Sequence, residues 1–421
     1  MRSTRGGHSV PDDRGQAVSQ IPARSVLTGN VLVSGLVSFF TDVSSEMIVP
    51  VLPLFVTTVL GATMTAVGLI EGVAESTASV MRSFAGLLSD RLGRRKPLIV
   101  FGYGLSNITK PLLALTGSWA QVLGIRFADR LGKGIRGAPR DALIADSVAA
   151  DRRGLAFGFH RSLDTAGAAL GPLVAFATLA IVPDNYRAVF WIATIPGAIA
   201  ILIAAFFIRD LPRPPAVRVL PGMKMAGLGR RFVVFTAIIT LFALGNSSDA
   251  FLILRAKNLG MPVATIPLAY FAFNVVYAGL STPAGVLSDR VGRRGVLIAG
   301  YVVFALVYLG FAVASGPAGR WMVPALFLTY GAYYALTEGI QRAFVVDLVP
   351  ADLRATALGT FASATGLALL PASLVAGFLW DRVGPAAPFF YGAAMSAAAA
   401  ILLVVLDAGT RKPFVQQARG R

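Results

Sequence analysis

The chain has 421 residues, of which 55% are hydrophobic and 14% charged, with a mean hydropathy of +0.69 and a formal net charge of +17. Soluble domains carry roughly 25% charged residues, so this composition excludes an ordinary soluble protein and indicates a membrane protein. The sequence has no cysteine, which excludes disulfides and thiolate metal sites, and only two histidines, His8 and His160. We therefore expect no metal site and no cofactor.

Twelve predicted transmembrane helices follow one another along the chain. Residues 1–28 come first; they are polar and basic and lack the apolar core of a signal peptide, so we expect a cytoplasmic tail. Apolar runs of about 20 residues or more, the length that spans a bilayer, fill most of the remainder. Glycine, proline and charge clusters divide these runs. The predicted helices cover residues 29–58, 64–89, 97–116, 119–147, 154–182, 187–208, 232–257, 262–288, 295–315, 320–349, 354–380 and 386–406.

A proline-rich, basic segment at residues 209–231 separates these helices into two sets of six. We interpret it as a cytoplasmic linker with no domain of its own. It joins an N-terminal six-helix bundle at 29–208 to a C-terminal six-helix bundle at 232–406, and a basic cytoplasmic tail follows at 407–421. The predicted fold class is therefore an all-α integral membrane protein.

The excess positive charge lies on one side of the predicted membrane. If both termini are cytoplasmic, most Lys and Arg residues of the loops and tails face the cytoplasm. The opposite side then holds Arg187, Arg255, Lys257, Arg320 and Arg382. This bias is the positive-inside pattern, which predicts a multi-pass protein of the inner membrane with both ends in the cytoplasm. Topology and contact with the lipid bilayer thus explain the charge, and we expect no nucleic-acid partner.

The sequence repeats itself after about 200 residues. The segment GLLSDRLGRRK at 86–96 recurs as GVLSDRVGRRG at 285–295, and ALIADSV at 142–148 recurs as AFVVDLV at 343–349. Internal repeats are typical of transporters, whose substrate sites lie near the membrane midplane between the two halves.

The first predicted helix carries two carboxylates within an apolar run, FFTDVSSEMIVPVLPLF. Asp42 and Glu46 lie at i and i+4, so they share one helix face. The stretch VSSEM at 43–47 has a counterpart in NSSDA at 246–250, which relates Glu46 to Asp249. We expect these two hydroxyl–carboxylate clusters to face each other across a central cavity.

The repeated loop is the most specific marker of a family. Its pattern G-x-L-x-D-R-x-G-R-R-K resembles that of the major facilitator superfamily, and the resemblance covers about residues 29–406. It implies two pseudo-symmetric bundles that work by alternating access, with the Asp of the loop helping to hold the cytoplasmic side closed. The gating residues so implied are Gly86, Asp90, Arg91, Gly93, Arg94, Asp289 and Arg290.

Two further motifs resemble the twelve-helix drug/proton antiporter branch. In the fourth predicted helix an Arg at 126 precedes A-L-I-A-D at 142–146, although Asp129 and Arg130 replace the usual Gln and Gly. In the fifth, G-x-x-x-G-P fits Gly167, Gly171 and Pro172, although Ala175 and Phe176 replace the usual closing glycines. This motif is associated in the family with export.

Charged residues within the membrane are costly, so they should face a cavity or one another. We expect Glu46 and Asp249, with Asp42 sharing the role, to carry protons or bind a cation, because desolvation favours the neutral form of a carboxyl group. The resemblance implies that Arg126 modulates them. The residues expected to line the substrate cavity are Ser45, Glu71, Glu75, Arg130, Ser248 and Glu338.

Structural roles compete with these functional ones. Glu338 with Arg342, and Arg161 with Asp164, have the spacing of ion pairs on one helix. The remaining candidates for packing rather than function are Lys110 with Asn107, His160, and the aromatic residues Phe39, Phe40, Phe271, Phe273, Tyr333 and Tyr334.

The sequence predicts a secondary transporter, not an enzyme, which exports a small molecule such as a drug or toxic metabolite in exchange for protons. The proton gradient would be its energy source and the monomer its working form. Three alternatives stay open. They are uptake or export of an organic anion, siderophore or metal chelate, export of a divalent metal, and a membrane receptor or scaffold that does not transport.

Overall fold

The computed structural model describes residues 29–92, 94–149, 152–211, 227–350 and 353–408. The predicted N-terminal tail, the C-terminal tail from residue 409, Gly93 of the gating loop and most of the predicted linker lie outside the described residues, and so do the side chains of Asp90 and Arg91. The fourteen α-helices of the described residues are α1 (Gly29–Ile48), α2 (Leu52–Thr58), α3 (Met64–Leu92), α4 (Lys96–Ala114), α5 (Trp119–Asp146), α6 (Arg153–Ile181), α7 (Tyr186–Phe207), α8 (Gly229–Gly245), α9 (Ala250–Asn258), α10 (Ile266–Val291), α11 (Arg293–Val313), α12 (Gly316–Asp347), α13 (Arg354–Arg382) and α14 (Ala387–Ala408).

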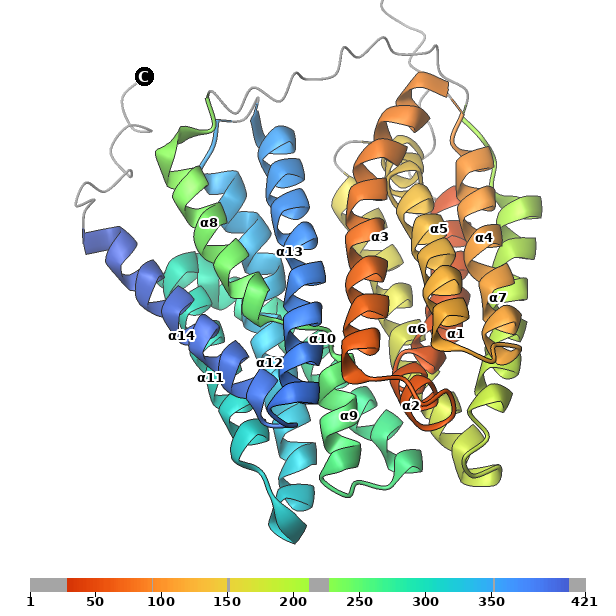
Figure 1. Cartoon of the computed structure of the whole chain (residues 1–421). Helices are drawn as coiled ribbons and strands as arrows, with labels where there is room; N and C mark the ends of the chain where they lie inside the picture. Colours follow the sequence, from red (N-terminus) through yellow and green to blue (C-terminus); the bar gives the residue numbers. More distant parts are fainter. Residues whose placement is uncertain (1–28, 93, 150–151, 212–226, 351–352, 409–421) are drawn as a thin grey trace, which may run out of the picture.

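These helices form two bundles side by side, α1–α7 in one and α8–α14 in the other (Figure 1). Because α1 continues into α2 and α8 into α9, the fourteen segments make twelve membrane-spanning rods, which confirms the predicted fold. Eight of the rods within the described ranges are long and apolar enough to cross a bilayer by composition alone. The other four, α3, α4, α5 and α12, carry polar and charged residues in their middle turns.

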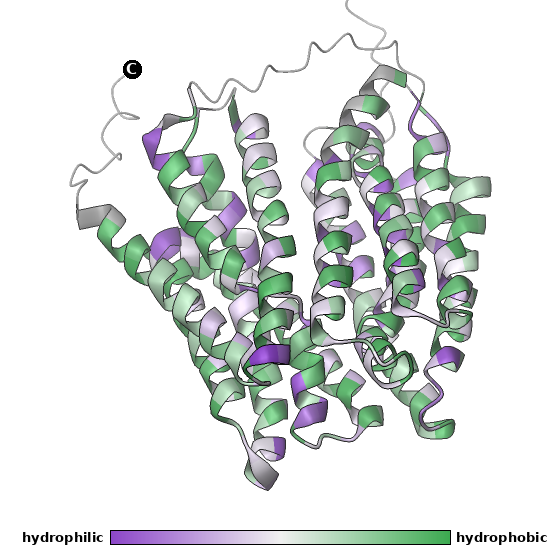
Figure 2. Ribbon diagram, viewed as in Figure 1, coloured by the Kyte–Doolittle hydropathy of each residue, from purple (hydrophilic) through white to green (hydrophobic). Residues whose placement is uncertain are grey.

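Figure 2 shows hydrophobic residues over the outward faces of α11, α14 and α7. Large apolar side chains are exposed there, among them Phe206, Leu306 and Ile401. In a soluble protein such a surface would be unstable, whereas in a bilayer it faces lipid.

The predicted first span over 29–58 is present, but it is not one continuous helix, because α1 ends at Ile48 and α2 begins at Leu52. Pro50 lies in the turn between α1 and α2, and Pro53 occupies the first turn of α2. Proline has no N–H to donate and its ring displaces the preceding turn, so the helix stops and starts again.

The seventh rod also breaks, but at a different place. Residues Asn246 to Asp249 are not helical, and α9 begins only at Ala250. In the first half, by contrast, the matching stretch 43–47 lies inside α1. The two halves therefore differ in backbone conformation at these related carboxylates, since Glu46 lies within a helix and Asp249 lies in the break between two helices.

The repeated segments contact each other within each half. We call the end of the molecule with the α3–α4 and α10–α11 turns the motif end. There Arg95 pairs with Asp146, and Arg293 pairs with Asp347 at 2.9 Å. Each pair joins an arginine of the repeated loop to the aspartate of the other repeated segment. The gating-loop residue Asp289 also lies 3.6 Å from Arg293.

At the opposite end, which we call the far end, the two bundles touch. Helix α3 lies so close to α13 that a Cβ on Gly68 would be 2.1 Å from the Ser373 carbonyl oxygen, and one on Gly377 would be 2.3 Å from that of Met64. Asp381, in the last turn of α13, accepts hydrogen bonds from the backbone N–H groups of Met64 and Thr65 at 3.0 and 2.8 Å. The Thr65 hydroxyl donates a third, at 2.6 Å. A residue of one bundle therefore caps a helix of the other.

Candidate transport cavity

A cavity of about 300 Å³ lies between the two bundles. Helices α1, α2, α3 and α5 form one wall, and the α8–α9 break with α10, α12 and α13 forms the other. The polar and aromatic lining residues are Glu46, Glu71, Glu75, Arg126, Arg130, Lys133, Asn246, Ser247, Ser248, Asp249, Tyr270 and Tyr334. The structure thus brings seven of the predicted site residues together, namely Glu46, Glu71, Glu75, Arg126, Arg130, Ser248 and Asp249.

On the N-terminal wall, the basic stripe of α5 pairs with the acids of α3. The Arg126 guanidinium donates to both carboxylate oxygens of Glu71 at 3.2 Å, and Arg130 lies 3.1 Å from Glu75. Asp129 lies 3.3 Å from Arg126 and 3.7 Å from Arg130, so it is a second counter-charge for both arginines. Arg126 and Arg130 are both buried. These contacts compensate most of the charge on this wall.

Glu46 and Lys133 differ from these pairs. In the part of the chain that the structure describes, neither has an ion-pair partner within 4 Å, although Lys133 and Arg130 are the cations that act most strongly on Glu46 through longer-range electrostatics. Glu46 also borders a second, small space of about 30 Å³, which it shares with Ser45, Lys110 and other residues of α4 and α5. The predicted residue Ser45 lies in this space rather than on the central cavity.

Ser44 does not face the cavity, so this part of the expected hydroxyl–carboxylate cluster is wrong. It is fully buried, accepts a hydrogen bond from the Lys110 ammonium at 2.6 Å and donates to the Ala193 carbonyl. Lys110 is only 3% exposed, so it stabilises the packing of α1, α4 and α7, while the amide oxygen of Asn107 packs against Gly197. In a helix with 3.6 residues per turn, side chains two positions apart are separated by about 200°, which turns Ser44 away from Glu46.

On the C-terminal wall, the Asp249 carboxylate is held by phenols. The Tyr330 hydroxyl donates to its Oδ1 at 2.8 Å and the Tyr334 hydroxyl to the same atom at 3.4 Å. Behind them lies a cluster of packed rings, in which Phe273 is 5.3 Å from Tyr270 and 5.2 Å from Tyr334 between ring centroids. Phe273 is therefore a packing residue.

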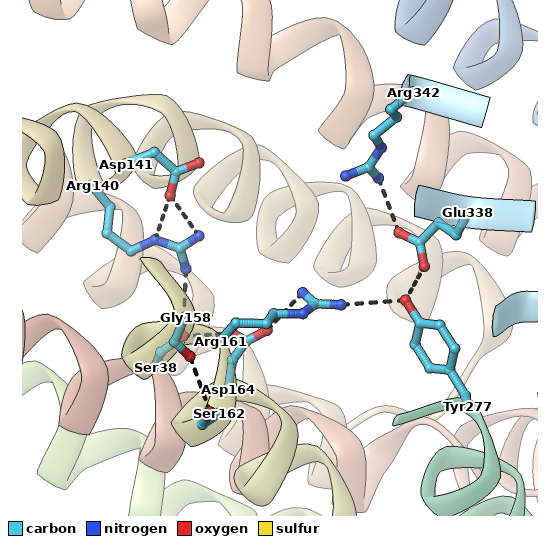
Figure 3. A network of polar contacts seen from close by, with 10 residues as sticks. All are labelled: Ser38, Arg140, Asp141, Gly158, Arg161, Ser162, Asp164, Tyr277, Glu338 and Arg342. Atoms are coloured by element: carbon cyan, nitrogen blue, oxygen red, sulfur yellow. Dashed lines mark hydrogen bonds and ion pairs between the residues drawn. The ribbon is translucent and has the colours of Figure 1, made fainter. Parts of the chain in front are cut away.

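A larger cavity of about 970 Å³ reaches the motif end, where Asp289 and Arg293 line it. A chain of polar contacts crosses it from one bundle to the other (Figure 3). Arg161 of α6 pairs with Asp164 at 3.0 Å and donates to the Tyr277 hydroxyl of α10 at 3.3 Å. The Tyr277 hydroxyl in turn donates to Glu338 of α12, which pairs with Arg342 at 2.9 Å.

Both predicted ion pairs are therefore present, and Glu338 lies in this larger cavity rather than the central one. Sequence reasoning missed Tyr277, which joins the two pairs. The role of Tyr277 could be found only from the packing of α6 on α10, because Arg161 and Tyr277 are 116 positions apart in sequence.

Asp42 lies beside Asp164, within hydrogen-bonding reach, and Ser38 also donates to Asp164 at 2.7 Å. Arg140, which sequence reasoning missed, binds Asp141 at 2.9 and 3.0 Å and reaches Ser38 at 3.4 Å. Asp42 thus belongs to the network at the edge of the larger cavity.

The predicted motif Gly167, Gly171 and Pro172 lies in α6, the fifth membrane-spanning rod, and positions this part of α1. A Cβ on Gly167 would lie 2.4 Å from the Phe39 carbonyl oxygen, and one on Gly171 would lie 2.8 Å from the Glu46 Cβ. The two glycines let α6 approach α1 along the stretch that carries both carboxylates, with Pro172 directly after the contact. Gly86 similarly faces Ala138 of α5, while Arg94 is exposed.

Comparisons with known proteins agree with this architecture. The family model of the Major Facilitator Superfamily matches residues 35–248 and 232–420. An uncharacterised MFS-type transporter of Methanocaldococcus jannaschii is 38% identical over 386 residues, which are 90% of this chain and 95% of that relative. The multidrug resistance protein MdtG of Enterobacter lignolyticus is 29% identical over 340 residues, with 76% of this chain and 78% of that protein covered.

Among solved structures, a mutant of the nucleoside transporter NupG superposes with a TM-score of 0.76 at 15% identity, covering 90% of this chain and 99% of that one. At this identity the likeness concerns the fold alone.

Proposed function

The chain belongs to the major facilitator superfamily, a family of multi-pass membrane transporters and not of enzymes, and we propose that it exports a small molecule in exchange for protons by alternating access. The observation that carries this proposal is the central cavity, in which carboxylates of both bundles meet. Glu46 comes from the first rod and Asp249 from the seventh. A site between two repeats is where such transporters bind their substrates.

The contacts between the bundles support alternating access. At the far end, α3 and α13 are in van der Waals contact and Asp381 caps α3. At the motif end, the larger cavity opens between the bundles. We propose that the motif end faces the cytoplasm of an inner membrane and that both termini lie there, because the arginine-rich loops of this end fit the positive-inside pattern. The structure then corresponds to an inward-open state.

Glu46 is the group we propose for proton coupling, with Asp42 in support. It lines the central cavity without an ion-pair partner among the described residues, whereas Glu71 and Glu75 are already paired with arginines. A carboxylate without a partner in a poorly hydrated site gains most from binding a proton. Arg126 would act through Glu71 and Asp129, as the modulating charge of the site.

Export is proposed rather than uptake for two reasons. The fifth-helix motif residues Gly167, Gly171 and Pro172 are present, and MdtG, a multidrug resistance protein, is similar over 76% of this chain. An antiporter of the drug/proton branch is therefore the finer assignment that we propose.

Proton flux in proteoliposomes tests this function. The purified protein is reconstituted with an internal pH dye, and a panel of organic cations, organic anions, metal chelates and divalent metals is added. We expect at least one compound to move protons in the opposite direction to itself. If no compound moves protons or is itself moved, the transporter proposal fails and a receptor or scaffold becomes the better assignment. Movement of compound and protons in the same direction would instead establish uptake.

The Glu46→Gln variant tests the coupling residue. It keeps the size of the side chain but cannot release a proton, so we expect substrate-driven proton flux to fall to the level of empty liposomes. The matched control is Asp184→Asn, the same carboxyl-to-amide change on an exposed turn at the far end. Full coupled flux in the Gln variant would remove Glu46 from the mechanism.

A further inference from the structure

The two walls of the central cavity differ in charge. On the N-terminal wall, acids and bases alternate and mostly pair with each other. The C-terminal wall consists of Asn246, Ser247, Ser248, Asp249, Ala250, Tyr270, Tyr334 and Leu369. Asp249 is the single charged residue among these, and no described cation lies within 4 Å of it. This wall therefore presents a negative charge without a counter-ion.

The hydrogen bonds of Asp249 leave one of its oxygens free. Both phenols donate to Oδ1, at 2.8 Å from Tyr330 and 3.4 Å from Tyr334. Among the described residues, Oδ2 has no donor. Asp249 is partly exposed. It directly precedes α9, at the end of the non-helical stretch that separates α8 from α9. The two phenols stabilise the ionised carboxylate and fix its orientation, so that its second oxygen is available to a ligand.

Aromatic rings border the same carboxylate. Tyr270 and Tyr334 line the cavity, and Phe273 fixes both through ring contacts at 5.3 and 5.2 Å. The faces of such rings attract organic cations, most strongly where water is excluded. Asn246, also on this wall, has a buried amide oxygen without a hydrogen-bond donor in the described part of the chain.

We propose that Asp249 anchors the ammonium group of an organic cation, with Tyr270 and Tyr334 against its body and the Asn246 amide oxygen as a second acceptor. This assignment rests on the proposed function, since it names the substrate class of the same cavity. A volume of about 300 Å³ suits a compact ligand with one aromatic ring or a few alkyl groups.

The position of Glu46 gives this site a direct link to protons. Glu46 and Asp249 border one cavity and lie within electrostatic range of each other. A cation held at Asp249 favours the ionised form of Glu46, while protonation of Glu46 weakens the attraction for the cation. Cation and proton therefore compete for the same cavity, which is the requirement for their exchange.

Binding to the purified protein without a pH gradient tests the site. Calorimetry with benzylammonium, benzyltrimethylammonium and tetraethylammonium is compared with benzyl alcohol and benzoate, the neutral and anionic counterparts. We expect at least one of the three cations to bind and the two counterparts not to bind. If none of the cations binds at millimolar concentration, or if benzoate binds as well as they do, the proposal is overturned.

Variants locate the site. Asp249→Asn should weaken cation binding by roughly 30-fold or more, because it removes the charge that faces the ligand. Tyr334→Phe keeps the ring and should bind nearly as the wild type, whereas Tyr334→Leu should weaken binding about three- to tenfold. Asp184→Asn is the matched control, and unchanged melting temperatures show that each variant is folded. Wild-type affinity in Asp249→Asn would refute the anchor.

Failure of this site and failure of the proposed function give different results. If ammonium ions bind through Asp249 but never move protons in liposomes, the cation site stands and proton-coupled export falls. If a neutral or anionic compound drives proton flux that Asp249→Asn leaves intact, transport stands and the cation site falls.

Discussion

Replacing Asp381 by Ala should open the far end of the molecule. In the structure, its carboxylate accepts bonds from Met64 N at 3.0 Å, Thr65 N at 2.8 Å and Thr65 Oγ1 at 2.6 Å. These three bonds join α13 to the start of α3, and they exist only while the bundles meet at this end. Their loss therefore destabilises the state that is closed at the far end and does not change the stability of the state that is open there.

The expected magnitude follows from the capping role of Asp381. Loss of an N-cap acceptor typically lowers stability by about 1–2 kcal/mol. A hydrogen bond to a charged group contributes about 1.5–3 kcal/mol, and because Asp381 is exposed to solvent we expect a value near the lower end of that range. A change of about 1–2 kcal/mol shifts a two-state equilibrium by roughly 5- to 30-fold. A state open at the far end that is populated at a few per cent would thus become a substantial fraction.

Spin labels can measure this shift, because the chain has no native cysteine to label by accident. Cysteines at Leu115 and Val383, exposed at the far end of opposite bundles, report the separation of that end by pulsed electron resonance. We expect Asp381→Ala to add a longer-distance population, and Asp184→Asn, a change at an exposed turn of the same end, to leave the distribution unchanged. An unchanged distribution in Asp381→Ala would refute the idea that this cap holds the end closed.

Two other contacts give further predictions. Tyr277→Phe removes the hydroxyl that joins Arg161 to Glu338, so it should weaken the link between the bundles at the larger cavity by about 1 kcal/mol. Spin labels at the motif end should then report a broader distance distribution, and an unaltered one would contradict the linking role. Glu71→Gln leaves the buried Arg126 without its main counter-charge and should lower the free energy of unfolding by about 3–5 kcal/mol, seen as a clear fall in melting temperature. An unchanged melting temperature would show that Asp129 alone compensates Arg126.

Apolar runs of membrane length predicted the helical rods well, because the bilayer imposes both their length and their internal hydrogen bonding. The break at Asn246–Asp249 was not predictable in the same way. Its counterpart at 43–47 has the same two serines and also a carboxylate, yet it lies in a continuous helix, so this shared pattern does not by itself determine the backbone. Proline residues at 50 and 53, in contrast, could have indicated the break after α1.

The cavity was predictable to the extent that helix periodicity determines which side chains share a face. Spacing alone placed Glu71 and Glu75 together, and the structure shows each bound to an arginine of α5. The phenols that hold Asp249 come from α12, more than 80 residues away, and no local pattern relates them to it. Helix–helix packing brings such long-range partners together, and the sequence pattern of a single helix does not predict this packing.

These partners also explain why two carboxylates related by the repeat should have different roles. Asp249 receives two phenol hydrogen bonds, which favour its ionised form and hold it ready for a cation. Glu46 has no such donors in the described residues. Of the two cations that act on it most strongly, Arg130 is already engaged by Glu75 and Asp129, whereas Lys133 has no ion-pair partner among the described residues. The first carboxylate is held in one orientation for a ligand to recognise, and the second has no hydrogen-bond donor or ion-pair partner among the described residues to hold it. Because the two carboxylates border one cavity within electrostatic range of each other, a cation at Asp249 and a proton at Glu46 oppose each other's binding.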